Sequence, residues 1–164
     1  MSLTSTRLRE VLDYDPDTGN FTWRVGKSGA AGIGQIAGGP TDRGYWRIEV
    51  DGTRYRAHRL AWLYMTDEWP SDQIDHINGT RSDNAWANLR LADNHLNHAN
   101  SKTPSNNSSG FKGVSWVQAR NKWAAYIKVN CKRLHLGYYN APEDASAAYA
   151  DAARKHWGEF ARVA

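Results

Sequence analysis

Residues 101–110, SKTPSNNSSG, constrain the organisation of this chain more than any other stretch. The run is dominated by Ser and Asn with a Pro and a Gly, and it contains no apolar side chain that would anchor it in a core. We therefore predict a linker at 101–110, with one domain before it at 1–100 and a second domain after it at 111–164.

The net charge of the chain changes sign across this predicted linker. Residues 1–100 contain 11 Lys and Arg against 13 Asp and Glu, a net charge of −2, whereas residues 101–164 contain 10 against 4, a net charge of +6. A basic excess confined to one short module favours the binding of a polyanion such as DNA. A basic surface that is merely solvated is the alternative that composition leaves open.

Composition also narrows the class of protein. No stretch approaches the roughly eighteen consecutive apolar residues of a membrane span, and the start MSLTSTRLRE lacks the apolar middle region of a signal peptide. Cys131 is the single cysteine of the sequence, so neither an intrachain disulfide nor a cysteine-rich zinc site can form. We therefore expect a cytoplasmic protein with no membrane partner.

The first part of the chain alternates between helix and strand signals, which predicts an α+β fold. A short helix is expected at its start, and the turn sequence DPDTG leads into the alternating strand NFTWRV. Residues 26–39 are rich in Gly but lack the Gly-Lys-Ser/Thr ending of a phosphate-binding loop, so we interpret them as a loop. Asp51 and Gly52 separate two alternating runs, which predicts a hairpin, and a helix with Leu60 and Ala61 follows.

The second part has a simpler pattern. GVSWV, KWAAYIKV and RLHLGYY predict three short strands, and APEDASAAYADAARKHWG predicts a helix with Pro in its first turn. We expect a three-stranded antiparallel sheet packed on that helix. Alternation in the middle strand directs Ile127 toward the helix, and it directs Tyr126 and Lys128 to the opposite face, where DNA is expected to bind.

Residues 73–100 contain the side chains best suited to chemistry. The stretch predicts a strand, a polar loop, a second strand and a helix that begins near Asp93. If the first strand ends at the Asp-His pair, Asp75 and Asn97 can offer two oxygen atoms to a hard cation such as Mg²⁺. His76 can then take a proton from water, and Asn88 can hold the other ring nitrogen and so fix the tautomer.

Several neighbouring polar residues have simpler interpretations. Asn78, Gly79 and Asn84 are typical turn residues, because Asn side chains bond to nearby backbone. His58 is expected to be a buried or hydrogen-bonded histidine rather than a ligand. His98 follows Asn97 directly, and its participation in the site stays open.

The stretch DHINGTRSDNAWANLRLADNHLNHAN resembles the ββα-metal motif of HNH endonucleases, in particular those of phage and intron-encoded homing enzymes, and AHRLAW resembles the segment before that motif. The resemblance implies metal ligation by Asp75 and Asn97, a general base at His76 and an orienting role for Asn88. It also implies a phosphate contact at Arg90. The family name refers to a final His, whereas this chain has Asn97 there.

The segment 111–160 resembles the Apetala/ERF DNA-binding domain, through GVSW, KWAAYIKV, LHLGYY and the helix that follows. The resemblance implies that the sheet face away from the helix enters the DNA major groove. Three positions depart from the usual residues of that family, which implies a different target sequence. The candidate DNA-contacting residues of this domain are Lys112, Ser115, Tyr126, Lys128, Lys132, Arg133 and His135.

Together these features predict a site-recognising DNA endonuclease of the homing type that acts on double-stranded DNA. One motif per chain predicts a monomer that nicks one strand, with Mg²⁺, or alternatively Mn²⁺, as its metal. The homing resemblance implies a phage-encoded protein in a bacterial host cell. Two alternatives remain: a non-catalytic DNA-binding regulator, and a structure-specific or non-specific nuclease.

Overall fold

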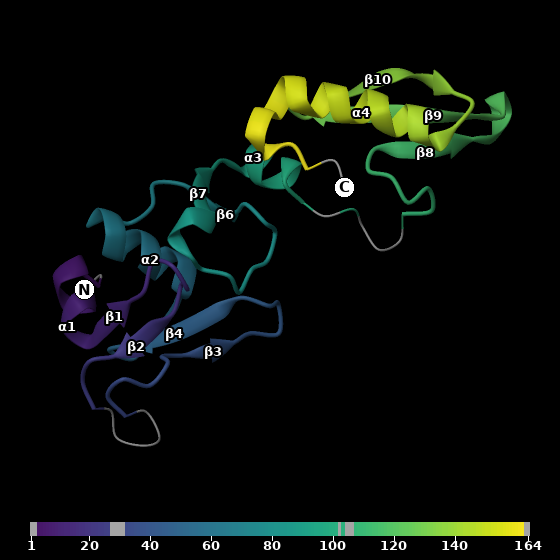
Figure 1. Ribbon diagram of the computed structural model, residues 1–164. Helices are drawn as coiled ribbons and strands as arrows, with labels where there is room; N and C mark the ends of the chain where they lie inside the picture. Colours follow the sequence, from purple (N-terminus) through teal and green to yellow (C-terminus); the bar gives the residue numbers. More distant parts are fainter. Residues whose placement is uncertain (1–2, 27–31, 102, 104–106, 163–164) are drawn as a thin grey trace. The chain divides into compact units, whose positions relative to one another are not determined.

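The computed structural model describes residues 3–26, 32–101, 103 and 107–162, and Figure 1 shows its helices and strands. The chain divides into two compact units, Met1–Ala92 and Asp93–Ala164. The division lies ahead of the predicted linker 101–110, so the helix that begins after Asp93 belongs to the second unit. Residues 27–31 of the Gly-rich stretch and residues 102 and 104–106 of the predicted linker lie outside the described residues.

The first unit combines two helices with three small antiparallel sheets among its described residues, in the pairings β1–β2, β3–β4–β5 and β6–β7. Its elements are α1 (Ser5–Val11), β1 (Leu12–Tyr14), β2 (Phe21–Trp23), β3 (Gly39–Pro40), β4 (Trp46–Val50), β5 (Thr53–Arg56), α2 (Ala57–Thr66), β6 (Gln73–His76), the 3₁₀ turn η1 (Trp86–Asn88) and β7 (Leu89–Ala92).

Turn chemistry fixes the β4–β5 hairpin at the predicted position. Asp51 and Gly52 both have positive φ, 48° and 75°, which matches the twist of a two-residue hairpin turn. The hairpin turns Ile48 and Val50 inward, where they join Leu60 of α2 in the core of the unit. The predicted hairpin is therefore confirmed, and its outward face is left to polar residues.

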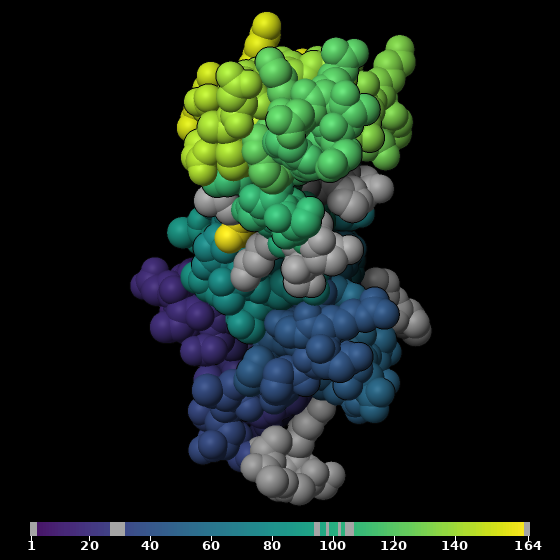
Figure 2. Space-filling model, turned by 90° about the vertical axis from the view of Figure 1, so that its right-hand side faces the viewer, coloured from purple at the N-terminus to yellow at the C-terminus, as the bar shows by residue number. Residues whose placement is uncertain are grey.

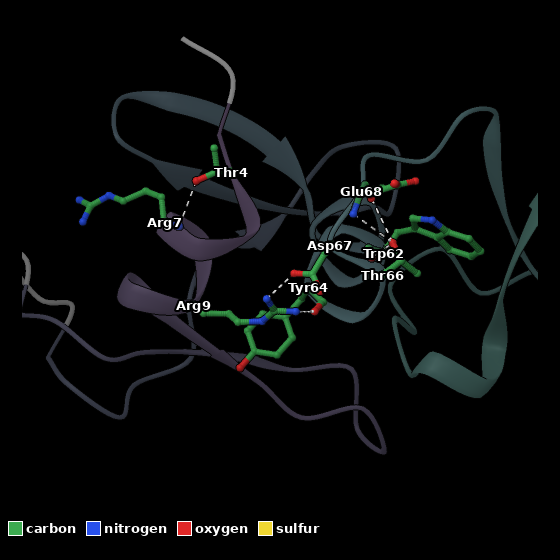
Figure 3. A network of polar contacts seen from close by, with 8 residues as sticks. All are labelled: Thr4, Arg7, Arg9, Trp62, Tyr64, Thr66, Asp67 and Glu68. Atoms are coloured by element: carbon green, nitrogen blue, oxygen red, sulfur yellow. Dashed lines mark hydrogen bonds and ion pairs between the residues drawn. The ribbon is translucent and has the colours of Figure 1, made fainter.

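Helices α1 and α2 are tied together by polar contacts at the end of α2 (Figure 3). Arg9 of α1 donates to the carboxylate of Asp67 and to the carbonyl of Tyr64. Asp67 adopts the left-handed conformation, with φ of 63°, and ends the helix. Thr4 caps the start of α1 by accepting a hydrogen bond from the Arg7 amide at 3.2 Å.

The second unit contains an antiparallel sheet with the strand order β10–β9–β8 and a long helix packed on it. Small side chains let this helix approach the sheet, since Ala145 and Ala153 are fully buried against it. The elements of the unit are α3 (Asn94–Ala99), β8 (Val114–Val117), the 3₁₀ turn η2 (Gln118–Arg120), β9 (Lys122–Val129), β10 (Lys132–Tyr139), α4 (Pro142–Trp157) and the 3₁₀ turn η3 (Gly158–Phe160).

Within the described part of the chain, we find no helix with the length and apolar character needed to span a membrane.

Candidate active site and nucleic-acid interface

The Asp-His pair lies at the end of β6, where the sequence placed it. His76 is the last residue of the strand, and both side chains are buried, each with a relative exposure of 5 %. In the pairing with β7, Asp75 lies opposite Arg90 and His76 lies opposite Leu89. A carboxylate and an imidazole therefore share a sheltered position at a strand end, where interactions between charges and dipoles are stronger than in bulk water.

Arg90 does not point into solvent, as a simple phosphate contact would. Its Nη2 and Nε atoms lie 2.9 and 3.0 Å from Oδ2 of Asp75, and both side chains are largely buried. Cross-strand register causes this arrangement, and a buried carboxylate is costly unless it is paired in this way. The predicted phosphate contact is thus engaged with the predicted metal ligand, and its guanidinium orients one oxygen of that carboxylate.

The environment of His76 is suited to proton transfer. Its Nε2 lies 3.3 Å from Oδ1 of Asn84, and the amide nitrogen of Asn84 donates to the Ser82 carbonyl at 3.1 Å. Because that second bond fixes which end of the amide faces the ring, we assign the proton to Nε2 and the lone pair to Nδ1. Burial lowers the pKa of His76, against the opposing effects of Asn84 and Asp75. The ring is therefore neutral near pH 7, as a base must be.

The expected contact between Asn88 and the His76 ring is wrong. Oδ1 of Asn88 accepts from the Asn78 amide at 2.9 Å, and its Nδ2 donates to the Asp83 carbonyl at 2.8 Å. Both groups of the Asn88 side chain therefore hold the loop between β6 and β7. Asn84, which we had interpreted as a turn residue, is 3 % exposed and provides the contact to the ring.

The loop that carries Asn84 is braced by residues far away in the sequence. Tyr14 donates from its hydroxyl to the Asn84 carbonyl at 2.7 Å, and the Trp86 amide donates to the Pro16 carbonyl at 2.8 Å. Gly19, with φ of 74°, packs so closely that an added Cβ would lie 2.2 Å from the carbonyl carbon of Asn84. The turn between β1 and β2 thus fixes the position of the residue that orients His76.

His58 belongs to the same cluster, although we expected an ordinary buried histidine. Its ring is 5 % exposed and lies 5.0 Å from the ring of His76, centroid to centroid, in an edge-to-face arrangement. Its Nδ1 is buried and has no hydrogen-bond partner among the described residues. Burial lowers the pKa of His58 to about 3, with a further lowering from His76 and two nearby arginines. The cluster therefore contains two neutral imidazoles in contact.

Helix α3 carries the second predicted metal ligand. Asp93 caps the helix by accepting from the Leu96 amide at 2.8 Å, as the sequence predicts. Asn97 is half-buried on this helix, in the second unit, whereas Asp75 belongs to the first. The side chain of His98 lies outside the described residues.

The chemistry of the predicted ligand pair fits a hard cation. Asp75 supplies a carboxylate beside His76, and an asparagine supplies an amide oxygen, which are ligands that Mg²⁺ accepts. Among the described residues, no group of three or more His, Cys, Asp or Glu side chains could hold a metal ion. Asp75 and Asn97 contribute one carboxylate and one amide, so they do not form a group of that kind. A cation held by these two ligands would keep its other positions open for phosphate and water.

The face of the β8–β9–β10 sheet that lies away from α4 gathers most of the predicted DNA-contacting residues. In register, Lys128 pairs with Arg133 and Tyr126 pairs with His135, so all four share one side. The Arg133 guanidinium lies 3.7 Å from the centroid of the Tyr126 ring. With Ser115, three of these residues line a hollow of about 340 Å³.

A β-bulge brings Tyr138 to this face, and Arg120 of η2 lies against its ring; neither residue was predicted from the sequence. The register shifts between His135 and Gly137, and Tyr138 consequently pairs with Ala124 on the side of the sheet away from α4. The Tyr138 ring lies 4.4 Å from that of His135, and the Arg120 guanidinium lies 4.7 Å from the Tyr138 ring. Gly137 inside a strand was the available signal, because glycine there often marks a bulge.

Two predicted DNA contacts do not lie on this face. Lys112 is half-buried, and its Nζ donates to the carbonyls of Ala99, Ser101 and Arg162 at 2.7, 2.8 and 3.4 Å, while burial lowers its pKa to about 8. Lys132 pairs with Val129 at the start of β10, on the side that packs against α4. We therefore correct both assignments: Lys112 satisfies carbonyl groups, and Lys132 projects on the opposite side from Arg133.

Comparisons with known proteins point to one family. The model of a family described as HNH endonuclease matches residues 55–99, which include His58, His76, Asp75 and Asn84. The chain is similar to protein 3.8 of Escherichia phage T7, with 37 % identity over 65 % of this chain and 88 % of that protein. It is also similar to an uncharacterized HNH endonuclease, L560, of Acanthamoeba polyphaga mimivirus, with 29 % identity over 92 % of this chain and 70 % of that protein. No solved structure matches.

Proposed function

Because this chain belongs to the HNH endonuclease family, we propose that it is a site-recognising nuclease of the homing type that nicks double-stranded DNA. The observation that carries the proposal is the buried His76 at the end of β6, whose Nε2 lies 3.3 Å from Oδ1 of Asn84 and which directly follows the buried carboxylate of Asp75 in the strand. A base and an oxygen ligand at one strand end are the two groups that metal-assisted phosphodiester hydrolysis needs.

In this proposal Nδ1 of His76 takes a proton from a water molecule, which attacks the phosphorus in line with the 3′ oxygen. Asn84 holds the ring in the required tautomer, and Arg90 keeps the Asp75 carboxylate in place. Asp75 and Asn97 are the residues that would hold a divalent cation, Mg²⁺ or alternatively Mn²⁺, which would supply positive charge to the phosphate and the departing oxygen. The family resemblance implies 5′-phosphate and 3′-hydroxyl products.

We assign site recognition to the second unit. Its exposed sheet face combines the cationic Arg133 with Tyr126 and His135, a composition suited to the edges of bases and to phosphates. The resemblance to the Apetala/ERF domain supports this assignment, and the residues Ser115, Tyr126 and His135 imply a target unlike that of plant relatives. One catalytic motif per chain implies a monomer that cuts one strand. Its similarity to a phage protein supports a phage origin and action in the cytoplasm of a bacterial host.

The proposal is tested by incubating the full chain with supercoiled plasmid, with Mg²⁺ or with chelator. The wild type should nick only with metal, and His76→Ala should lower the single-turnover rate by ~10²–10⁴ while DNA affinity is retained. Full nicking by His76→Ala would remove it as the base. Metal-independent binding without cleavage by the wild type would instead favour a regulator, and nicking confined to branched substrates would favour a structure-specific nuclease.

Two asparagines provide a matched comparison. Asn84→Ala removes the acceptor for Nε2 of His76 and should lower the nicking rate by roughly tenfold or more, whereas Asn88→Ala should act through loop stability and lower it less. A larger loss in Asn88→Ala, at equal thermal stability, would return the orienting role to Asn88.

A further inference from the structure

The arginines of the first unit fall into two sets according to their partners. One set is paired with carboxylates of the same unit: Arg7, Arg9, Arg24, Arg54 and Arg90. The other set has no carboxylate partner among the described residues: Arg43, Arg47, Arg56, Arg59 and Arg81. The first unit has more acidic than basic residues, so every arginine could in principle have had a carboxylate partner. The lack of such partners for these five arginines, within the described part of the unit, therefore calls for an explanation.

Members of the unpaired set converge on one aromatic ring. The Arg56 guanidinium lies 4.0 Å, and the Arg81 guanidinium 5.0 Å, from the centroid of the Tyr45 ring. Arg81 also donates to the Arg43 carbonyl at 3.2 Å, which holds it there. The Tyr45 ring is in contact with the active-site cluster, at 5.5 Å from the His58 ring and 6.2 Å from the His76 ring. Two cations therefore lie against an aromatic ring that is itself next to the proposed base.

The β4–β5 hairpin extends this positive surface. Arg47 and Arg56 lie directly opposite each other on its exposed face, where like charges destabilise a sheet. One step further along, Glu49 lies opposite Arg54, and these two form an ion pair at 3.1 Å. In Figure 2 the blue part of the chain, which includes β4, forms a continuous face toward the viewer. A like-charged pair on an exposed face offers two guanidinium groups to an anion, whereas the neighbouring Arg54 is already neutralised by Glu49.

His58 provides an independent observation that points to a ligand site at the same place. Its ring is in contact with Tyr45 and with His76, and its Nδ1 is buried without a partner among the described residues. Buried polar atoms are paired in most proteins, and an exception calls for an explanation such as a ligand or water. A phosphate oxygen or a water bound to phosphate would satisfy a neutral imidazole.

We propose that Arg56 and Arg81, which lie over Tyr45, together with Arg47 opposite Arg56, called here the arginine bracket, bind backbone phosphates of the DNA strand next to the phosphodiester that is attacked by the water activated by His76. The proposal rests on the proposed function and adds a DNA-binding surface within the catalytic unit itself. This surface replaces Arg90, whose charge is neutralised by Asp75. Because it contacts phosphates, the bracket holds every DNA sequence equally and positions the strand rather than selecting the site.

The test compares Arg56→Gln and Arg81→Gln with Arg54→Gln in the full chain carrying His76→Ala, by titrating a labelled random-sequence duplex at several salt concentrations. Arg54 is the matched control, because it lies on the same strand and face as Arg56 but is paired with Glu49. Each bracket variant should lose about fivefold to tenfold in affinity near 0.1 M salt, and its log-affinity versus log-salt slope should fall by about one unit. Arg54→Gln should change neither quantity.

The same substitutions in the catalytically competent chain should raise the plasmid concentration needed for half-maximal nicking. Thermal denaturation separates binding from folding: Arg56→Gln should change the melting temperature little, because relief of the repulsion with Arg47 offsets loss of the contact with the Tyr45 ring. If both bracket variants bind and nick like Arg54→Gln, the bracket is overturned while wild-type nicking still supports the proposed function. If the wild type fails to nick, the proposed function fails, and the salt titrations still decide whether the bracket binds DNA.

Discussion

The hairpins β6–β7 and β9–β10 each place an arginine on their second strand, and the two arginines are used in opposite ways. Arg90 lies across from Asp75 and forms a buried ion pair with it. Arg133 lies across from Lys128, is exposed, and rests on the Tyr126 ring. The comparison shows that the cross-strand neighbour, rather than the charge of the segment, decides whether an arginine stabilises the fold or remains available to DNA.

The largest expected difference between the hairpins is in stability. Arg90→Ala leaves the buried Asp75 carboxylate without its cation and should lower the free energy of unfolding by ~3–5 kcal/mol. Arg133→Ala should change it by less than ~0.5 kcal/mol, as is usual for exposed residues. Urea denaturation of the two variants measures both values, and equal losses would break the comparison.

Acid should affect the two regions differently as well. The pKa of His58 is about 3 in the folded chain against 6.5 for an ordinary histidine, so between these values the unfolded chain binds a proton that the folded chain excludes. The contribution of His58 to stability is therefore complete above pH 6.5 and falls with decreasing pH, by up to about 1.4 kcal/mol per pH unit.

Urea denaturation of the wild type and of His58→Gln, at several pH values between about 7 and 4, measures how the free energy of unfolding depends on pH. The expected slope in the wild type corresponds to roughly one proton taken up on unfolding. The variant should lose stability less steeply on acidification. His135→Gln is the control in the second hairpin, because His135 is exposed. An unchanged slope in His58→Gln would show that the buried ring is not the acid-sensitive group.

For DNA-binding specificity, in contrast to stability, the larger effect should come from the arginine of the β9–β10 hairpin. If Arg133 contacts a guanine edge, Arg133→Ala should cost ~1–3 kcal/mol on the cognate site and much less on random DNA. Competition binding with both DNAs measures the ratio. Equal losses on both would reduce Arg133 to a phosphate contact and would place it beside the arginine bracket in function.

The smallest expected effects separate two lysines of the second unit. Lys128→Ala should reduce the salt slope of DNA binding by about one unit, because the side chain is exposed on the sheet face. Lys112→Ala should leave the slope unchanged and destabilise the unit by roughly 1–3 kcal/mol, since three carbonyl groups lose their donor. A reduced slope in Lys112→Ala would restore its predicted contact with DNA.

Local chemistry was predictable from the sequence. Asp51 and Gly52 specify a hairpin turn, and Asp93 caps a helix, because both depend on a few neighbouring residues. The position of His76 at a strand end also follows from short-range pattern. The roles of Asp75 and Asn97 as metal ligands remain predictions.

Features that depend on register or on distant contacts were not predictable. Asn84 replaces Asn88 at the His76 ring because Tyr14 and Gly19 hold the loop. The spacing of residues within the motif does not reveal these two distant contacts. The orientation of Arg90 depends on which residue of β6 it faces. Tyr138 reaches the exposed face only through a bulge, and Lys112 is buried by segments at both ends of its unit.

Because the β1–β2 turn supports the Asn84 loop, it limits which segment of this enzyme can be transferred to another protein by recombination. The family match begins at residue 55, yet Tyr14, Pro16 and Gly19 all contact the loop that carries Asn84, the residue beside the His76 ring. A chimera that inherits 55–99 alone would receive the proposed catalytic residues without the contacts that hold the Asn84 loop. The transferable cassette is therefore longer than the recognisable motif, and it must begin before β1.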